Sequence, residues 1–390
     1  MSISAAASAR STGSEHAPVR VMVVDDSVVA RSMIMRWIED EPDLLGVAAL
    51  RNGREAIDQI ELWNPDVVIL DLVMPEIDGL TALPRLLEKR PGLVVLVAST
   101  QTRRNAAISM RALSCGASDY IFKPESRYDR LGDQSFRLEL IDKVRALGLH
   151  RQRHARPGSS RIVGAPPTRA ARRDIAACIP AERNPSGMTL RVAPLVPPRV
   201  LLIGASTGGP HALGTIVSGL GAVIDKVPVL VAQHMPPDFT TYLAEHLARA
   251  SGRPANEAVD GEPIRRGMIY VAPGGRHMRV ARRDDGPVIT LDDGPAANFC
   301  KPAVDFLFSS AVTVWGAAVP ALVLTGMGPD GARGADKIVT AGGSVIVQDE
   351  ESSVVWGMPG AVVRAGLAAA VLPLDAIAQQ LVLAFGEGQP

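Results

Sequence analysis

The chain has 390 residues, of which 47% are hydrophobic and 21% charged, enough for two or three globular domains with cores of their own. Its 41 basic and 41 acidic residues give a formal net charge of zero, which excludes binding of nucleic acid or membranes through overall charge. The three cysteines, Cys115, Cys178 and Cys300, are scattered and form no CxxC pair, so we expect free thiols in a reducing cytosol.

The first 18 residues predict a disordered tail. They contain no apolar segment of the kind that a signal peptide requires. No apolar run in the chain reaches the roughly 20 residues of a membrane-spanning helix. We therefore expect a cytoplasmic protein with no membrane insertion.

Residues 19–140 predict a first domain in which short apolar runs alternate with helical stretches. The runs are VRVMVVD, LGVAAL, DVVILD, LVVLVAS and SDYIF. Strands that alternate with helices form a parallel sheet covered on both faces. The expected fold is a doubly wound, flavodoxin-like α/β domain.

Acidic residues end two of these predicted strands. Asp25 and Asp26 follow the first strand, and Asp71 ends the third. The carboxyl ends of neighbouring strands share one crevice in such a sheet, so the three carboxylates are expected to lie together. A hard cation such as Mg²⁺ relieves their mutual repulsion. Ser99 and Lys123, at the ends of the fourth and fifth strands, are placed on the same rim, where Lys123 can pair with an added phosphoryl group.

These residues, with the MPEIDG segment after Asp71, resemble the receiver domain of two-component response regulators. The resemblance implies that Asp71 accepts a phosphoryl group from a histidine kinase, while Asp25 and Asp26 help to hold Mg²⁺. It implies that Ser99 and Lys123 contact the phosphoryl oxygens. It also implies that Tyr120 is the aromatic residue that moves with the switch.

Residues 141–197 predict a flexible linker rich in arginine and proline. The stretch 151–199 holds ten arginines, eight prolines and only two acidic residues, and shows no sustained periodicity. Its charge leaves two interpretations open, a solvated tether and a segment that docks on an acidic partner.

Residues 198–390 predict a second doubly wound α/β domain of Rossmann-like type. Its strand-like runs include RVLLIGAS, VPVLVAQH, GMIYVAPG, PVITLDD, PALVLTG and GSVIVQD. The first run leads into the loop GASTGG, which could hold a phosphate or present a nucleophile. A dinucleotide fingerprint requires glycine where Ser206 stands, and a P-loop requires a lysine that is absent here. The segment Gly204–Gly208 instead matches GxSxG, a nucleophile on a strand-to-helix turn.

Two further strand ends supply partners for Ser206. His234 follows VPVLVAQ, and Asp330 lies in the glycine-rich loop after PALVLTG. On one rim, these residues can act as nucleophile, general base and orienting acid. Their order along the chain, Ser-His-Asp, differs from that of α/β-hydrolases, which indicates a different fold.

Six collinear segments resemble the catalytic domain of the CheB family of chemotaxis protein-glutamate methylesterases: GASTGGP, QHMPPDFT, VAPGGRHM, DDGPAANFCKPAVDFLFSS, LTGMGPDGARG and QDEESSVVWGMPGAV. The resemblance implies a Ser206 nucleophile, a His234 base and an Asp330 that orients His234. It implies a glutamate γ-methyl ester on a methyl-accepting chemotaxis receptor as substrate, with release of methanol, and hydrolysis of glutamine amides at the same sites. It also implies a CheA-type histidine kinase as phosphodonor.

The backbone N–H groups of Thr207 and Met327 are our candidates for stabilising the oxyanion. His277 and Asp305 fall in matching segments and leave two interpretations open, substrate binding and a structural role. We expect a monomer that is regulated in cis by its receiver. Two rival functions are a hydrolase with another ester or amide target and a phosphorylation-switched binding module with an inactive site. A DNA-binding output has no support, because no basic recognition helix is present.

Overall fold

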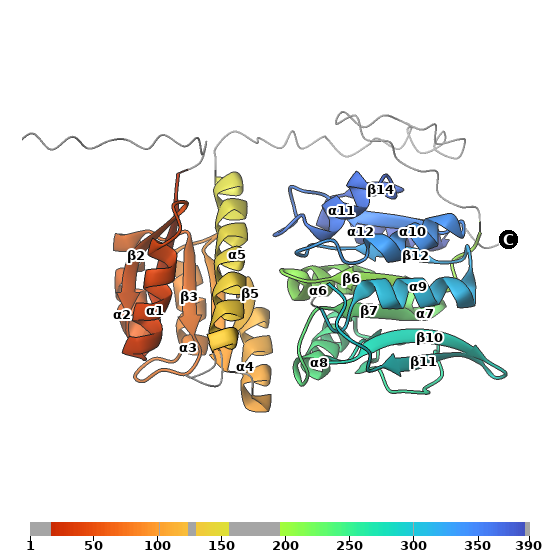
Figure 1. Ribbon diagram of the computed structural model, residues 1–390, viewed down its shortest axis with the longest axis horizontal. Helices are drawn as coiled ribbons and strands as arrows, with labels where there is room; N and C mark the ends of the chain where they lie inside the picture. Colours follow the sequence, from red (N-terminus) through yellow and green to blue (C-terminus); the bar gives the residue numbers. More distant parts are fainter. Residues whose placement is uncertain (1–16, 101, 124–129, 156–195, 299, 387–390) are drawn as a thin grey trace, which may run out of the picture.

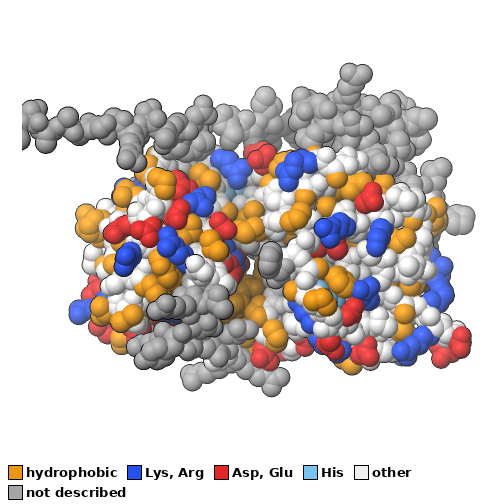
Figure 2. All heavy atoms as spheres, viewed as in Figure 1, with side chains coloured by type: hydrophobic (Ala, Val, Ile, Leu, Met, Phe, Trp, Pro, Cys, Tyr) orange, Lys and Arg blue, Asp and Glu red, His pale blue; other side chains and the backbone are white. Residues whose placement is uncertain are grey.

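The computed structural model describes residues 17–100, 102–123, 130–155, 196–298 and 300–386, which form two α/β units side by side (Figure 1). Most of the expected tail and linker lie outside these residues. Within the described ranges, no helix is both long and apolar enough to cross a membrane. On the face drawn in Figure 2, acidic and basic side chains are interspersed over both units, in keeping with the balanced composition.

The first unit is a five-stranded parallel sheet in the order β2-β1-β3-β4-β5. Its central strands are buried on both faces, which is why they appear in the sequence as continuous apolar runs. This strand order is that of flavodoxin-like sheets, so the expected fold is confirmed. The elements are β1 (Val19–Val24), α1 (Val28–Glu39), β2 (Leu44–Leu50), α2 (Gly53–Trp63), β3 (Val67–Asp71), α3 (Gly79–Lys89), β4 (Val94–Thr100), α4 (Arg103–Ser114), β5 (Asp119–Lys123) and α5 (Arg130–Ala155).

Helix α5 corrects one expected boundary, because residues 141–155 are helical and do not start a linker. Val144 and Leu147 are at most 1% exposed and belong to the core formed with the sheet. Their spacing of three residues is that of one helix face. The arginines near its end gave residues 141–155 a linker-like composition, but the apolar residues of this segment belong to the receiver core.

The second unit is built on a seven-stranded parallel sheet in the order β14-β13-β12-β6-β7-β9-β8. The order reverses between β6 and β12, so the ends of these two strands flank the switch point. The elements around this sheet are β6 (Leu201–Ala205), α6 (Gly209–Gly219), α7 (Gly221–Lys226), β7 (Val229–Gln233), α8 (Phe239–Ser251), β8 (Ala255–Glu257), β9 (Ile269–Val271), α9 (Val304–Trp315), β12 (Pro320–Val323), α10 (Ala332–Thr340), β13 (Ser344–Gln348), α11 (Met358–Arg364), β14 (Ala370–Leu372) and α12 (Leu374–Gly386).

A separate antiparallel hairpin lies beside this sheet. It pairs β10 (His277–Arg283) with β11 (Gly286–Asp292), and Arg283 faces Gly286 across a two-residue turn. The run PVITLDD therefore belongs to the hairpin and not to the parallel sheet. The turn residues Asp284 and Asp285, followed by Gly286 at a φ of 124°, favour a tight reversal over a helical crossover.

Aromatic side chains join the two units. Tyr120 of β5 stacks on Phe239 of α8 with ring centroids 5.7 Å apart, and Phe122 meets Phe239 edge-on at 4.4 Å. Helix α4 packs along α8, where Ser114 Oγ lies 3.2 Å from His246 Nδ1 (Figure 1). The receiver thus contacts the second unit through α4 and β5.

The end of α5 makes a second contact with the loop after β13. His154 Nε2–H donates to the carbonyl of Glu351 at 2.8 Å, and Arg153 lies 3.6 Å from Glu350. The same loop carries Val354, which packs against the receiver core. A Cβ added to Gly208 would lie 2.7 Å from Val354 Cγ2, so Val354 also contacts the loop after β6.

Gly148 should be required for α5 to reach β1. A Cβ at this position would lie 2.2 Å from Val19 Cγ1, so we expect Gly148→Ala to lower the free energy of unfolding by about 1–3 kcal/mol. Thermal unfolding of the full chain measures the effect. Gly386→Ala is the control, since no atom lies within 4 Å of its added Cβ. Equal melting of the two variants would contradict this packing.

Candidate functional site

The loops after β6 and β12 are held together at the switch point, where open α/β sheets bind ligands. Ser206 N–H donates to the carbonyl of Thr325 at 3.0 Å, and Thr325 Oγ1 donates to the carbonyl of Thr207 at 3.0 Å. Gly326 permits this approach, since a Cβ there would lie 2.7 Å from Ser206 Cβ. The backbone around Ser206 is therefore fixed from both strands.

Two backbone donors beside Ser206 are available to a ligand. Among the described residues, neither Thr207 N–H nor Met327 N–H has an acceptor. Thr207 leads into α6, and Met327 follows Gly326, which contacts Ser206. Unused N–H groups next to a serine can stabilise negative charge on a carbonyl oxygen.

His234 and Asp330 are paired at this rim. His234 Nε2–H donates to Asp330 Oδ2 at 2.7 Å, and the Asp330 side chain is fully buried. Its Oδ2 also accepts from Val304 N–H at 2.6 Å, and its Oδ1 accepts from Asp305 N–H at 3.1 Å and Gly331 N–H at 3.0 Å. The first amides of α9 thus hold this carboxylate in place.

The two partners shift each other's protonation. Burial alone would raise the pKa of Asp330, but the hydrogen bond and charge of His234 and the α9 amides outweigh burial and lower that pKa. Burial alone would lower the pKa of His234, but the hydrogen bond to Asp330 and the nearby Cys300 side chain raise the pKa to about 9. Among the described residues, no hydrogen bond joins Ser206 to His234. Because Nε2 is bonded to Asp330, Nδ1 is the nitrogen that can accept a proton from Ser206.

Two buried glutamines near this rim were not predicted. Gln233 Nε2 donates to the carbonyls of Ser206 at 2.9 Å and His234 at 3.1 Å, and so links the two loops. Gln348 Oε1 accepts from Thr325 N–H at 2.9 Å. Each is the last residue of its strand, β7 or β13. A polar residue that ends an otherwise apolar strand was the signal that could have identified them.

His277 and Asp305 do not line an open cavity. His277 is fully buried, and its ring hydrogen bonds go to backbone groups. Asp305 is 8% exposed, and its Oδ1 accepts from Gly334 N–H at 2.7 Å. Burial and the neighbouring Asp330 raise the pKa of Asp305 to about 6. Of the two interpretations left open, the structural role fits both residues better.

The receiver crevice brings its predicted acidic residues together. Ligand oxygens of Asp25, Asp26 and Asp71 all lie within 4.8 Å of one another. Lys123 Nζ lies 2.6 Å from Asp25 and 2.7 Å from Asp71. Burial raises the pKa of Asp71, and Lys123 opposes that shift. Clustered carboxylates with partly buried oxygens are a donor set that suits a hard divalent cation.

Ser99, expected to contact the phosphoryl oxygens, and Tyr120, expected to move with the switch, make their side-chain contacts with residues other than the three carboxylates. Ser99 is 2% exposed, and its hydroxyl is 2.9 Å from that of Ser109 on α4. Tyr120 is 4% exposed and lies against Phe239. Burial raises the pKa of Tyr120 well above its usual value, so its ring is neutral. Both residues therefore face the side of the receiver that contacts the second unit.

Comparison with known proteins confirms both resemblances. Residues 201–381 match the CheB methylesterase family, and residues 21–131 match the response regulator receiver domain. A protein of Nitrobacter hamburgensis named protein-glutamate methylesterase/protein-glutamine glutaminase is 58% identical, covering 94% of either chain. A protein of the same name from Rhodopseudomonas palustris strain HaA2 is 55% identical over 99% of either chain. The crystal structure of the Thermotoga maritima CheB methylesterase catalytic domain is 39% identical, covers 48% of this chain and 99% of its own, and has a TM-score of 0.46. The chain therefore belongs to the CheB methylesterase family and carries a response regulator receiver domain ahead of its methylesterase domain.

Proposed function

We propose that this protein is a phosphorylation-activated serine hydrolase of chemotaxis adaptation. Its substrates are glutamate γ-methyl esters of methyl-accepting chemotaxis receptors, and it also deamidates receptor glutamines. The observation that carries the proposal is the Ser206 loop fixed beside the His234–Asp330 pair, with two N–H groups left open. The names of the relatives, protein-glutamate methylesterase/protein-glutamine glutaminase, support protein glutamate esters and glutamine amides as the substrate class.

In the proposed reaction, Ser206 Oγ attacks the ester carbonyl while His234 Nδ1 takes the hydroxyl proton. Thr207 N–H and Met327 N–H stabilise the oxyanion, a contribution worth about 10²–10³ in rate per donor. The C–O bond to the leaving group breaks, and His234 returns its proton to form methanol. Water then attacks the acyl-enzyme with His234 again as base, and this releases the glutamate and restores Ser206.

The receiver crevice supplies the regulation in this proposal. Asp25, Asp26 and Asp71 would hold Mg²⁺, which neutralises charge during phosphoryl transfer. Asp71 accepts the phosphoryl group from a CheA-type kinase. Lys123, now shared by two carboxylates, pairs with the new phosphoryl charge, and Ser99 turns toward it. Tyr120 stacks on Phe239, so its movement alters the contact between domains.

The contact between domains favours control by docking. Phe239 begins α8 after β7, and Val354 lies in the loop after β13, so the segments that follow two strands near Ser206 contact the receiver. Weakening this contact after phosphorylation of Asp71 would free the rim for a receptor helix. We further propose that the protein works in the cytoplasm as a monomer.

The first experiment measures methanol released from a methylated receptor cytoplasmic fragment. We expect release to increase with Mg²⁺ and a small phosphodonor, to vanish in Ser206→Ala, and to stay at its basal rate in Asp71→Ala. No release in any state would contradict the receptor ester as substrate. An acylating probe then distinguishes the rivals, since labelling of Ser206 indicates another substrate and its absence an inactive site.

The pH dependence follows from the raised pKa of His234. A general base must be neutral, so kcat/KM for methanol release should rise with pH and reach half of its plateau at about pH 9, where His234 is half protonated. Asp330→Asn removes the anion that stabilises the charged ring, so the midpoint should move to lower pH while kcat falls about 10²–10⁴-fold. An unchanged midpoint in Asp330→Asn would show that a group other than His234 sets the rising limb of the pH profile.

Removing Phe122 tests the docked state from the receiver side. Phe122 lies edge-on against Phe239 at 4.4 Å, so Phe122→Ala weakens the contact and leaves the methylesterase domain unchanged. We expect severalfold higher methanol release without phosphodonor. Leu62→Ala is the matched control, because Leu62 is 75% exposed on α2. Equal basal rates in the two variants would contradict control by docking.

A further inference from the structure

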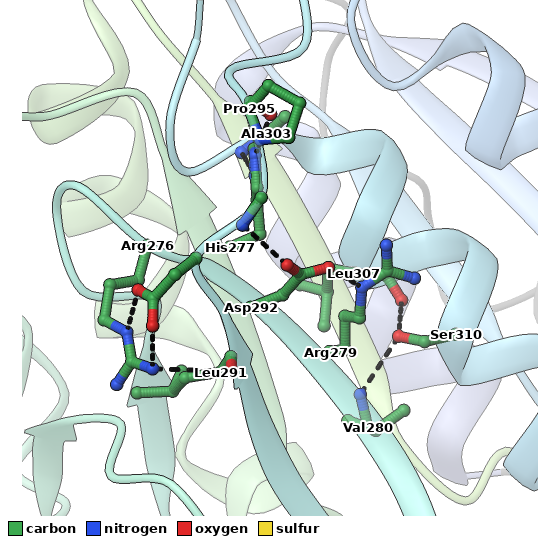
Figure 3. A network of polar contacts seen from close by, with 12 residues as sticks. Arg276, His277, Arg279, Val280, Leu291, Asp292, Pro295, Ala303, Leu307 and Ser310 are labelled. Carbon is green, nitrogen blue, oxygen red and sulfur yellow. Dashed lines mark hydrogen bonds and ion pairs between the residues drawn. The ribbon is translucent and has the colours of Figure 1, made fainter.

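His277 occupies a buried position at the start of β10, where both ring nitrogens are bonded to the backbone (Figure 3). Its Nε2 lies 3.0 Å from the carbonyl of Pro295, and its Nδ1 lies 3.1 Å from the amide of Ala303. A carbonyl only accepts and an amide N–H only donates. The ring is therefore neutral, with its proton on Nε2 and a lone pair on Nδ1.

The ring of His277 is also fixed by stacking. It lies parallel to Phe306 of α9, with centroids 3.9 Å apart and planes 4° from parallel. The Arg279 guanidinium lies 4.2 Å from the Phe306 ring centroid and is held by Asp292 at 2.8 Å. The hairpin thus contacts the start of α9 through one stacked ring and one directed hydrogen bond, from Ala303 N–H to His277 Nδ1.

The amide that donates to His277 belongs to Ala303, the residue just before α9. Ala303 is the N-cap of α9 and provides no capping side chain. The next two amides, of Val304 and Asp305, donate to the two oxygens of Asp330. A shift of Ala303 therefore shifts two of the donors that aim Asp330 at His234.

We propose that His277 is a positioning residue for the hydrolase reaction, which acts on Asp330 through Ala303 and the α9 amides. Its lone pair on Nδ1 anchors Ala303, the α9 amides fix the carboxylate, and the carboxylate orients His234. His277 itself contacts neither substrate nor Ser206. The inference depends on the proposed function for its activity readout, whereas its spectroscopic readout depends only on the His234–Asp330 contact.

Two substitutions separate the two hydrogen bonds of His277. In His277→Asn, the amide oxygen can take the place of Nδ1 and accept from Ala303 N–H. In His277→Gln, the amide nitrogen can take the place of Nε2 and donate to Pro295, but the acceptor for Ala303 is lost. We expect kcat for methanol release to fall roughly 10- to 100-fold in His277→Gln, with KM unchanged. His277→Asn should stay within a few-fold of the unsubstituted protein, as rescue by the variant that keeps the acceptor.

The far-downfield proton NMR signal of His234 Nε2–H reports on the contact directly, without substrate. We expect this signal to shift or broaden in His277→Gln and to persist in His277→Asn. Equal kcat and equal spectra in the two variants would overturn the proposal. Absence of methanol release from the unsubstituted protein would contradict the proposed function. The spectra of the two variants would still test the role of His277, because they require no substrate.

A measurement on the unsubstituted protein covers the case in which both variants unfold. Nitrogen-15 NMR of the imidazoles distinguishes a protonated Nε2 with a bare Nδ1 from the other neutral form and from imidazolium. We expect the first form for His277 at neutral pH. Either of the other forms would overturn the proposal, because Nδ1 could then accept nothing from Ala303.

Discussion

The need to stabilise the buried carboxylate of Asp330 constrains how the second domain is arranged. A buried charge is costly unless it is fully hydrogen-bonded, and Asp330, with no exposed surface, receives four donors. Three of them are backbone N–H groups, which surround Asp330 only when α9 and the loop after β12 are folded. The fourth is His234, at the end of β7. The same contacts that make burial of this charge tolerable also orient His234 toward the Ser206 loop.

The features of this arrangement that could be predicted are those that depend on residues close together in the sequence. Apolar runs bounded by glycine and polar residues located the strands, and the strand ends placed Ser206, His234 and Asp330 on one rim. The α9 amides, Gln233 and His277 could not be predicted in these roles, because each makes a decisive contact 25 to 27 positions away in the chain: Asp305 with Asp330, Gln233 with Ser206, and His277 with Ala303. The hairpin and the length of α5 were missed for a related reason, since turn chemistry and tertiary burial outweighed composition there.

The carboxylates of the receiver crevice are stabilised differently from the carboxylate of Asp330. Asp330 is stabilised by dipoles that do not move, whereas Asp71 is stabilised by Lys123, a side chain 17% exposed on a strand end. A lysine side chain can rotate toward new negative charge, whereas backbone amides held in a folded helix and loop cannot. This difference fits the two proposed roles. The receiver crevice changes its contacts on phosphorylation, whereas the hydrolase site keeps its geometry.

The link between the two crevices depends on packing more than on charge. The Arg153–Glu350 pair is at least 39% exposed on each side, and such pairs contribute about 0–1 kcal/mol. Tyr120, in contrast, is buried, with Lys143 Nζ bonded to its carbonyl at 2.6 Å and its ring stacked on Phe239. A full reversal from mostly closed to mostly open takes about 5.5 kcal/mol. Exposed ion pairs alone cannot supply that difference, so the proposed switch must act through repacking of Tyr120 and its aromatic neighbours.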